Sequence, residues 1–341
     1  MITGFVNGNV YVSFKPLRKA EAFAVAGERI VYVGSNSGVM NLVKAVNGRL
    51  VDLGGKTVLP GFVDSHVHID ELGIHLNTVD LRGVRSISEM RERLREAAKS
   101  AKTLWVLGHG WDQELFEEKR WPTRWDIDDV VRHRPALLTR ICLHVGLLNT
   151  RAIEVTKVST LESPNVVRDE RGVPTGIVRE DALGYVLEKV RESLSVEDYE
   201  NLVKDALRFA ASQGVTTLGF AGCDEKLLKA LANLWARGEL TVRVRVYMSP
   251  GPSWRTIELL KEMGVVRGFG DQYLKIMGVK IIADGTLGAR TAWLSQPYAD
   301  DPTTSGAPDI PPDELRDLVR KVHGLGLQLA VHGIGDKAIE A

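Results

Sequence analysis

The sequence predicts an α/β fold in which parallel strands alternate with helices, preceded by a small antiparallel β unit. Three observations support this prediction. Apolar and polar residues alternate with period two up to about residue 59, as in half-buried strands. After Gly55, short runs rich in Val and Ile end in polar or Gly-bearing loops. Helical stretches lie between these runs, and such alternation is typical of a parallel sheet.

Residues 1–59 are predicted to form the small β unit. The segments "GNVYVSF" and "EAFAVAGERIVYVG" alternate apolar and polar residues. Within the second, Ala26-Gly27-Glu28 fits the turn of a hairpin, because glycine adopts the backbone conformations that tight turns need. We therefore expect antiparallel pairing in this unit.

Residues 60–341 are predicted to form the alternating domain. Its strand candidates are "GFVDSHVH" from Gly61, "GVTTLGFAG" from Gly214, "VRVRVYMSP" from Val242, "LKIMGVKIIADG" from Leu274 and "LQLAVHGIGD" from Leu327. Helices are predicted over Val196 to Ser212 and Pro312 to Leu325. In the barrel form of such a fold, chemistry occurs at the carboxyl ends of the strands.

A long insertion, about residues 71–195, separates the first of these strands from the second. It contains the amphipathic helix "SISEMRERLREAAKS", the apolar segments "TLWVLGHGW" and "PALLTRICLHVGLL", and the break "RGVPTGIV". We expect it to form a subdomain over the barrel mouth, because loops at that end tolerate insertions and determine substrate specificity.

The composition favours a small-molecule ligand. Lys+Arg and Asp+Glu both number 44, so there is no strong field to attract nucleic acid or an anionic membrane surface. Cys142 and Cys223 show no metal-binding or disulfide spacing. The amino terminus lacks the pattern of a signal peptide, and no apolar run is long enough for a membrane span. We therefore expect a cytoplasmic protein.

His66 and His68 are the first candidate metal ligands. Side chains alternate along a strand, so Phe62, Asp64, His66 and His68 share one side. Two neutral imidazoles at a strand end are ligands that a transition metal can use. The alternative is one hydrogen-bonded core histidine and one incidental one.

His332 is the third candidate. It follows an apolar run and precedes a Gly-bearing loop, where a strand-end ligand is expected. Alone it would be assigned a structural role, but together with His66 and His68 it becomes a candidate ligand.

Lys280 stands in the apolar run "IMGVKIIADG". Burial of an ammonium there is costly, and desolvation lowers its pKa. Two arrangements avoid the cost: an ion pair with Asp64 or Asp284, or a carbamate formed with carbon dioxide that binds metal as an anion. Spacing alone favours the ion pair.

The ordered motifs "GFVDSHVH", Lys280 and "VHGIGD" resemble the amidohydrolase superfamily, metal-dependent hydrolases on a (β/α)8 barrel with a β-sandwich made from both chain ends. The similarity runs from about residue 5 to the last residue. Further segments are similar to its family 3, the N-substituted formamide deformylase-like branch: "VLGHGWDQ", "ICLHVGLLNTRAI", "PTGIVRED" and "VKIIADGTLGARTAWL".

The resemblance implies that His66 and His68 bind one divalent metal ion, and that His332 binds a second. A carbamylated Lys280 would bridge the two, so the resemblance ranks the carbamate above the ion pair and gives Lys280 a catalytic role. Zinc is the expected metal, as one or two ions, with iron or manganese as alternatives. A metal-bound hydroxide would attack the carbonyl of an amide-like small molecule, since metal lowers the pKa of water from about 15.7 to about 7.

Substrate contacts are implied less directly. His144 is expected to donate a hydrogen bond to the substrate carbonyl, with a packing histidine as the alternative. Trp111 and Asp112 are expected to line the pocket, with a solvated loop as the alternative, and Asp284 is a further candidate substrate-binding residue. For Glu180 an ion pair within the insertion is favoured over substrate contact. The branch usually has Arg at His109 and Asp-Gly-His-Ala at residues 142–145, where this chain has Cys-Leu-His-Val.

The chain ends soon after His332, which predicts an incomplete (β/α)8 barrel of about five of eight strands, with part of a β-sandwich before it. The family's remaining metal histidine and its aspartate would lie on later strands. A competing hypothesis is therefore a catalytically incomplete chain that binds metal or assembles with others. Such assembly would be a homo-oligomer or a complex with a second chain that supplies the missing strands.

Overall fold

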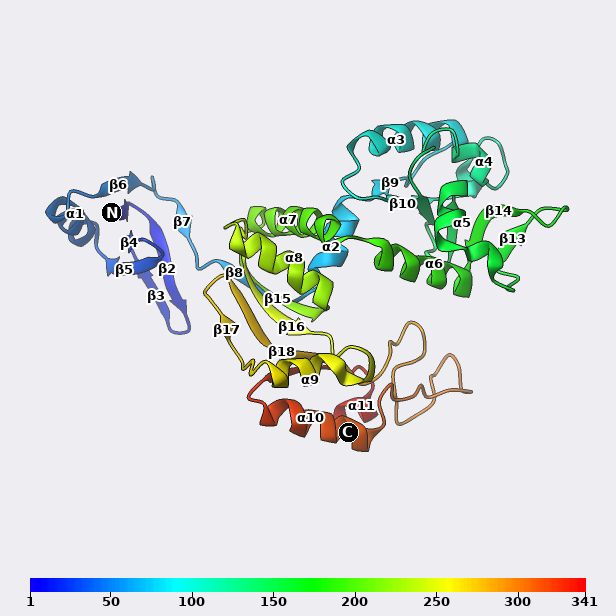
Figure 1. The fold of residues 1–341 in the computed structure, drawn as a ribbon. Coiled ribbons are helices and arrows are strands. Elements are labelled where there is room, and N and C mark those ends of the chain that lie inside the picture. Colours follow the sequence, from blue (N-terminus) through cyan, green and yellow to red (C-terminus); the bar gives the residue numbers. More distant parts are fainter. The chain divides into compact units, whose positions relative to one another are not determined.

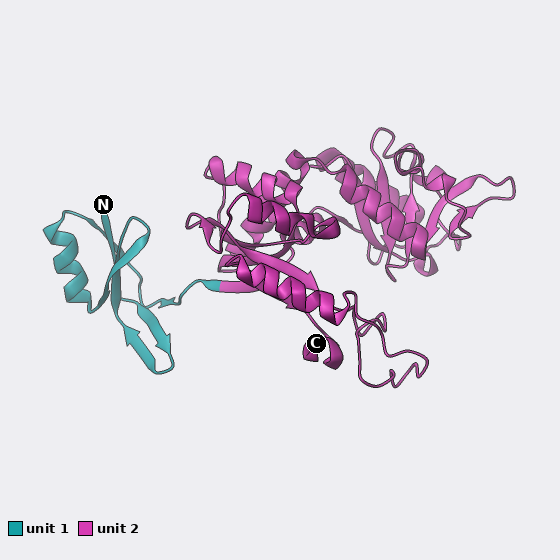
Figure 2. Cartoon of the chain, turned by 60° about the horizontal axis from the view of Figure 1, so that its bottom comes forward, with its two compact units in different colours: residues 1–62 teal, residues 63–341 magenta.

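The computed structural model describes residues 1–341 and divides into two compact units, Met1–Phe62 and Val63–Ala341 (Figure 2). The boundary falls at the start of β8 (Phe62–Val67), where the sequence analysis predicted a division after residue 59. No helix combines the length and the apolar character needed to cross a bilayer.

The first unit is a mixed α/β structure rather than the antiparallel β unit that was predicted. Its elements are β1 (Ile2–Val6), β2 (Asn9–Phe14), β3 (Leu17–Ala20), β4 (Ala22–Ala26), β5 (Arg29–Gly34), α1 (Asn36–Ala45), β6 (Arg49–Asp52) and β7 (Thr57–Val58). The predicted hairpin is present as β4 and β5. However, β1 pairs with β6 in parallel, and so does β2 with β7.

Helix α1 was not predicted from the alternation of apolar and polar residues. The Ser35 hydroxyl accepts a hydrogen bond from the Gly38 N–H and caps the helix, and Val39 and Val43 bury one face of it. Their spacing of one helical turn was a signal for a helix, but the surrounding period-two pattern masked it. Because a helix connects β5 to β6, the chain can return in the direction that parallel pairing requires.

The second unit contains all five strands predicted for the alternating domain. Its elements outside the insertion are β8, α2 (Ile69–Leu76), α7 (Val196–Ser212), β15 (Val215–Cys223), α8 (Glu225–Ala236), β16 (Arg243–Met248), η3 (Pro252–Trp254), α9 (Arg255–Glu262), β17 (Phe269–Gly270), β18 (Leu274–Ile282), α10 (Pro312–Gly324), β19 (Gln328–His332) and α11 (Asp336–Glu340). The strand order is β8-β15-β16-β18, with β19 on the far side of β18. The pairs β15–β16, β16–β18 and β18–β19 are parallel.

One face of this sheet packs against helices. On β16, Val244, Val246 and Met248 are buried while Arg243 and Arg245 remain partly exposed, which is the alternation expected of a strand with one covered face. Helix α7 contacts β15, α8 contacts β18 and α10 contacts β19 (Figure 1). Buried side chains of these strands and helices form one core cluster. The opposite face of the sheet, which carries Arg243 and Arg245, is not part of this core.

The sheet has two free lateral edges, at β8 and at β19. On the β8 edge Val63 is 66% exposed. On the other edge Val331 is 44% exposed. Unpaired strand edges with exposed apolar side chains are unfavourable in an isolated protein.

The insertion forms its own layered structure. Its elements are β9 (Val79–Asp80), α3 (Ile87–Ser100), β10 (Val106–Trp111), η1 (Gln113–Leu115), α4 (Arg124–Ile127), β11 (Ala136–Arg140), β12 (Val145–Leu148), α5 (Thr150–Thr156), η2 (Val158–Thr160), β13 (Val166–Arg168), β14 (Pro174–Arg179) and α6 (Glu180–Ser193). The strands form one sheet in the order β13-β14-β12-β11-β10-β9. Two core clusters cover it, one containing residues of α3 and α4 and the other residues of α5 and α6.

Asp284 fixes the chain at the carboxyl ends of β18 and β19. Its side chain is fully buried and accepts hydrogen bonds from the backbone N–H groups of Trp293 (2.8 Å), Ile334 (2.9 Å) and Gly335 (2.7 Å). Burial raises the pKa of Asp284, but these donors outweigh it and the pKa is lowered. The structure thus gives Asp284 a positioning role, in place of the direct substrate contact that the sequence predicted.

We expect Asp284→Asn to lower the free energy of unfolding by about 1–3 kcal/mol at neutral pH, because an amide replaces a buried charged acceptor of three backbone donors. Urea denaturation measures this loss. The contribution is complete above the unfolded-state pKa of about 3.9 and is lost as the pH falls through the lower folded-state pKa, so the gap to wild type narrows in acid.

The matched control is Asp317→Asn, since Asp317 is 77% exposed and pairs only with Arg320 on the surface. Its effect should stay below about 1 kcal/mol. Equal stability of wild type and Asp284→Asn at neutral pH would contradict the positioning role.

Candidate metal and substrate site

His66 and His68 lie at the carboxyl end of the edge strand β8. His66 is within the strand, and His68 follows it as the residue before α2, without a capping hydrogen bond from its side chain. Their ring centroids are 5.5 Å apart, edge to face. Both residues are exposed, so neither is the hydrogen-bonded core histidine of the alternative interpretation.

Lys280 is buried, with 7% of its surface exposed, near the carboxyl end of β18. It forms no ion pair with Asp64 or Asp284, so the pairing that spacing favoured is not observed. Desolvation alone lowers the pKa of Lys280. A buried amine with no compensating charge is costly and calls for a chemical explanation.

His332 ends β19 and is in register with Ile282 of β18. Its Nε2 lies 3.0 Å from the carbonyl oxygen of Gly285. Because a carbonyl only accepts, Nε2 carries the hydrogen, and the lone pair of the neutral ring is on Nδ1. A hydrogen bond of this kind orients a histidine that ligates metal through its other nitrogen.

The pKa of His66 depends on the residues at the neighbouring strand ends. Desolvation lowers the pKa of His66, and the charges of Lys280, His68 and His332 lower it further, against the opposing effect of Asp64. This lowering favours the neutral form of His66, which is the form that metals bind. No three His, Cys, Asp or Glu side chains converge in a metal-binding arrangement, so a complete ligand set would require Lys280 or groups from elsewhere.

A cavity of about 300 Å³ adjoins this group of residues. His68 and Lys280 line it together with Gly222, Ser249, Pro250, Trp254, Ile282, Asp309 and Ile310. Sequence reasoning missed these further residues. The signal for some of them was present, because "SPGPSW" directly follows the carboxyl end of a predicted parallel strand, where barrel sites gather their loops.

Trp111 does not line a pocket. It is fully buried in the insertion, donates from Nε1 to the carbonyl of Leu138 (2.8 Å) and packs edge to face on Trp121. The expectation for Trp111 was therefore wrong, and so was the alternative of a solvated loop. The reason is that β10 extends through this residue, so that its side chain enters the core.

The Asp112 carboxylate is engaged within the insertion. It accepts hydrogen bonds from the Glu114 N–H (3.3 Å) and from the Arg140 guanidinium (2.7 Å). Arg140 also donates to the side-chain oxygen of Gln113 (2.8 Å). These contacts give Asp112 a structural role, in place of the expected pocket-lining one.

His144 and Glu180 form an exposed ion pair, with 3.1 Å between Nδ1 and the carboxylate. Their side chains are 68% and 62% exposed, so His144 is not a packing histidine and remains accessible to a ligand. For Glu180, the ion pair that was favoured over substrate contact is observed.

His109, which replaces the arginine usual in the branch, contacts a different set of side chains. Its Nε2 is 3.9 Å from Asp80, its ring lies 5.5 Å from that of His75, and its buried Nδ1 has no hydrogen-bond partner. Asp80 is already bound by the Arg82 guanidinium.

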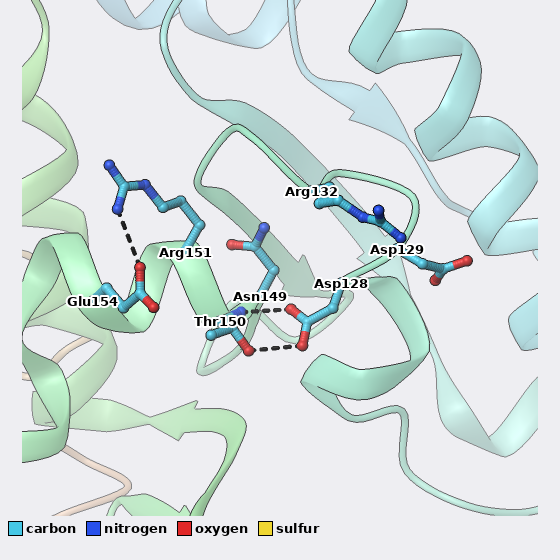
Figure 3. A pocket seen from close by; sticks show the side chains of 7 residues that line it. All are labelled: Asp128, Asp129, Arg132, Asn149, Thr150, Arg151 and Glu154. Carbon is cyan, nitrogen blue, oxygen red and sulfur yellow. Dashed lines mark hydrogen bonds and ion pairs between the residues drawn. The ribbon is translucent and has the colours of Figure 1, made fainter.

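A larger cavity, of about 400 Å³, opens on the insertion (Figure 3). Most of its charged groups have partners: Asp128 accepts from the N–H and hydroxyl of Thr150, Arg151 pairs with Glu154, and Asp129 pairs with Arg91. No histidine or cysteine lines it. It therefore offers no group for the predicted chemistry, and the smaller cavity beside Lys280 is the better candidate.

The two cysteines have opposite environments, which gives a direct test of the insertion's geometry. For exposed Cys142, burial of part of the thiol raises the pKa, but the hydrogen bond and charge of Arg140 outweigh this and lower it. For buried Cys223, desolvation raises the pKa. Iodoacetamide should therefore label Cys142 in the native protein with a pH midpoint below the usual value of about 8.5, while Cys223 reacts only after unfolding.

In Arg140→Gln the Cys142 pKa should rise, and labelling at pH 7 should slow several-fold because less thiolate is present. Cys223 serves as the internal control for the native state. Labelling of Cys142 at an unchanged rate in Arg140→Gln would contradict the contact.

Comparison with known proteins shows the chain's family. A model of the amidohydrolase family matches residues 49–341. Protein LONG AFTER FAR-RED 3 of Arabidopsis thaliana is 31% identical over 97% of this chain and 58% of its own length. N-substituted formamide deformylase of Arthrobacter pascens is 25% identical over 98% of this chain and 64% of its own length. The chain thus spans about three-fifths of the length of these relatives.

A solved structure extends the likeness to the whole described chain. A metal-dependent hydrolase of Pyrococcus furiosus, itself uncharacterized, superposes with a TM-score of 0.89 at 39% identity, covering 100% of this chain and 69% of its own. The family's fold is the barrel of alternating strands and helices to which the sheet order of β8 through β19 conforms. The family match, the sheet and the strand-end residues together show that the chain belongs to the amidohydrolase family, specifically its family 3.

Proposed function

We propose that this chain provides the catalytic half-barrel of a metal-dependent hydrolase acting on C–N bonds of amide-like small molecules. The supporting observation is Lys280, a buried and unpaired lysine at a strand end, in one cavity with His68. Retaining such a group has a cost in stability, and such costs occur preferentially at functional sites. The family match and the metal-dependent hydrolase of similar structure support the same class of protein.

The residues present fit a divalent metal in part. We propose His66, His68, carbamylated Lys280 and His332 as its ligands, with zinc, iron or manganese as the ion. When bound, the metal would lower the pKa of a water molecule and polarise the scissile carbonyl. The uncompensated Lys280 fits the carbamate, because carbamylation converts a costly buried cation into an anion that a metal neutralises.

The chain's own groups position the candidate ligands and contact the substrate. The Gly285 carbonyl fixes the His332 ring through Nε2, and Asp284 holds the loop that follows β19. We further propose that His144 donates to the substrate carbonyl. Since the Glu180 carboxylate lies at Nδ1, the ring must carry protons on both nitrogens to donate from Nε2, and Glu180 balances that positive charge.

Metal analysis of the purified chain tests the ligand set. We expect bound zinc, iron or manganese in wild type, with occupancy rising when bicarbonate is added. Lys280→Ala should bind less metal and lose the response to bicarbonate, because no anionic ligand can form at that position. A carbamate carbon signal in NMR after addition of ¹³C-bicarbonate gives a readout that is independent of activity.

The control is Lys275→Ala, on the same strand and half-buried. It should keep both the metal content and the carbamate signal. Unchanged metal stoichiometry in Lys280→Ala would contradict the proposed carbamate. Absence of bound metal in wild type would contradict the proposed mechanism.

A second candidate function is supported by the open edges of the sheet. The chain would then bind metal but hydrolyse substrate only when further strands, from a second polypeptide or another copy, cover β8 and β19. Phe62, which is 56% exposed at the start of β8, and Val331 on β19 are the apolar groups that such strands would cover.

An amide hydrolysis assay distinguishes the two candidates. Under the second candidate, the zinc-loaded chain should show little hydrolysis of N-substituted formamides and related amides, because the open sheet leaves the site uncovered. Supplying the relatives' later strands as a co-expressed segment should restore it. Robust turnover by the isolated chain would eliminate the second candidate, and inactivity of the assembled form towards a broad amide panel would count against the first.

A further inference from the structure

Three cationic side chains lie together on the face of the barrel sheet opposite its core. Arg243 and Arg245 are two residues apart on β16, and Lys275 of β18 is in register with Arg245. Residues that alternate with them, such as Val244 and Ile276, belong to the helix-covered core, so the three cations point to the other face. We refer to these three side chains as the cationic layer.

The guanidinium of Arg245 has no carboxylate partner. It donates to the backbone carbonyls of Val244 (3.2 Å) and Gln272 (3.0 Å), although a guanidinium carries five N–H donors. Desolvation lowers the pKa of Arg245 and the charge of Arg243 lowers it further, so the surroundings disfavour its charged form. Like charges on paired residues of neighbouring strands also destabilise a sheet, and Lys275 occupies the paired position. The open sheet therefore retains positive charge that nothing balances.

Two acids near this part of the sheet are engaged elsewhere. The charge of Asp271 opposes the lowering of the Arg245 pKa, but its carboxylate accepts hydrogen bonds from the N–H of Tyr273 (2.7 Å) and from a second backbone N–H (3.0 Å). Asp64 is on β8, which β15 separates from β16, and its carboxylate accepts from the N–H of His66 (3.2 Å). A counter-charge for the cationic layer therefore has to come from outside this chain.

We propose that the cationic layer is the docking surface for a polypeptide strand that brings Asp or Glu side chains to this face of the sheet. The inference rests on the second candidate function, in which further strands cover the open sheet, and it names the chemistry that those strands require. Length supports such a partner, because this chain spans about three-fifths of the relatives compared above and 69% of the Pyrococcus furiosus hydrolase. Inward side chains of a barrel pack in layers, so a closing strand buries these cations and has to neutralise them.

Charge disfavours a second copy of this chain as the partner on this face. A two-fold contact brings the same patch of both copies together. The cationic layer would then face itself, and like charges across a contact repel. A different polypeptide that carries carboxylates is therefore favoured over another copy.

The cationic layer lies apart from the candidate metal ligands. Arg243 begins β16 and Lys275 is the second residue of β18, whereas Lys280 is five residues further along that strand, or about 16 Å at the usual rise. Docking can therefore be measured without metal or substrate.

Co-purification with a complementing segment tests the docking surface. The probe is the part of the Pyrococcus furiosus hydrolase outside its match to this chain, tagged and co-expressed with the full 341-residue chain. The wild-type chain should co-purify with the segment. Arg245→Glu should reduce the co-purified chain at least tenfold, and Arg245→Met, which removes only the charge, should also reduce it. Replacing the pairing Asp or Glu of the segment by Lys should restore binding to Arg245→Glu and weaken binding to wild type.

The matched control is Lys229→Glu, which makes the same change of charge at an exposed residue of the outer helix α8. It should co-purify as wild type does. Urea denaturation of the isolated chain separates docking from folding. Arg245→Glu places a carboxylate between Arg243 and Lys275, so its urea midpoint should equal or exceed that of wild type. A lower midpoint in both Arg245→Glu and Arg245→Met would assign Arg245 to the folding of this chain and overturn the docking surface.

The outcomes distinguish this inference from the second candidate function. Unchanged co-purification of both Arg245 variants would overturn the inference while assembly with further strands stands. No co-purification of the wild-type chain would overturn both. Self-association of the wild-type chain that Arg245→Glu abolishes, measured by analytical ultracentrifugation, would assign the face to a second copy and overturn the inference. Carboxylate-dependent co-purification together with robust turnover by the isolated chain would refute the second candidate and leave the inference standing.

Discussion

The candidate site depends on a sheet in which β15, β16, β18 and β19 run parallel and β8 lies beside β15. Parallel strands direct all their carboxyl ends to one edge of a sheet, so residues that are far apart in the sequence gather there. His66, Lys280 and His332 come from three different strands, yet the charges of the latter two lower the pKa of the first. Asp284 completes this alignment by tying the loops after β18 and β19 to each other through backbone hydrogen bonds.

Lys280 is where stability and function conflict. The sheet around it is apolar, and desolvation disfavours its ammonium form without any carboxylate to compensate. Asp284, the nearest acid in sequence, is unavailable because backbone donors occupy its oxygens. The same buried carboxylate that orders the loops thus leaves the lysine free for other chemistry.

The insertion shows how a motif can be correctly located and wrongly assigned. Trp111 and Asp112 lie in a segment that resembles the family closely, and both serve the insertion's own fold: Trp111 fills a core cluster and Asp112 pairs with Arg140. A sequence motif records which residues occur together, but not whether they face a ligand or each other. His144, by contrast, projects an accessible imidazole from the same sheet.

The sequence by itself determined the five strands, their order and the helices between them, because apolar periodicity and turn residues are local properties. It also indicated that His66, His68 and His332 lie at strand ends and that Lys280 lies within an apolar strand. Only the tertiary structure decided that Lys280 has no ion-pair partner, that Asp284 is a positioning residue, and that Pro250, Trp254, Ile282 and Ile310 enclose a cavity beside them. Those outcomes depend on which groups from distant segments come into contact, and on which donors form hydrogen bonds with Asp284. The local sequence pattern encodes neither.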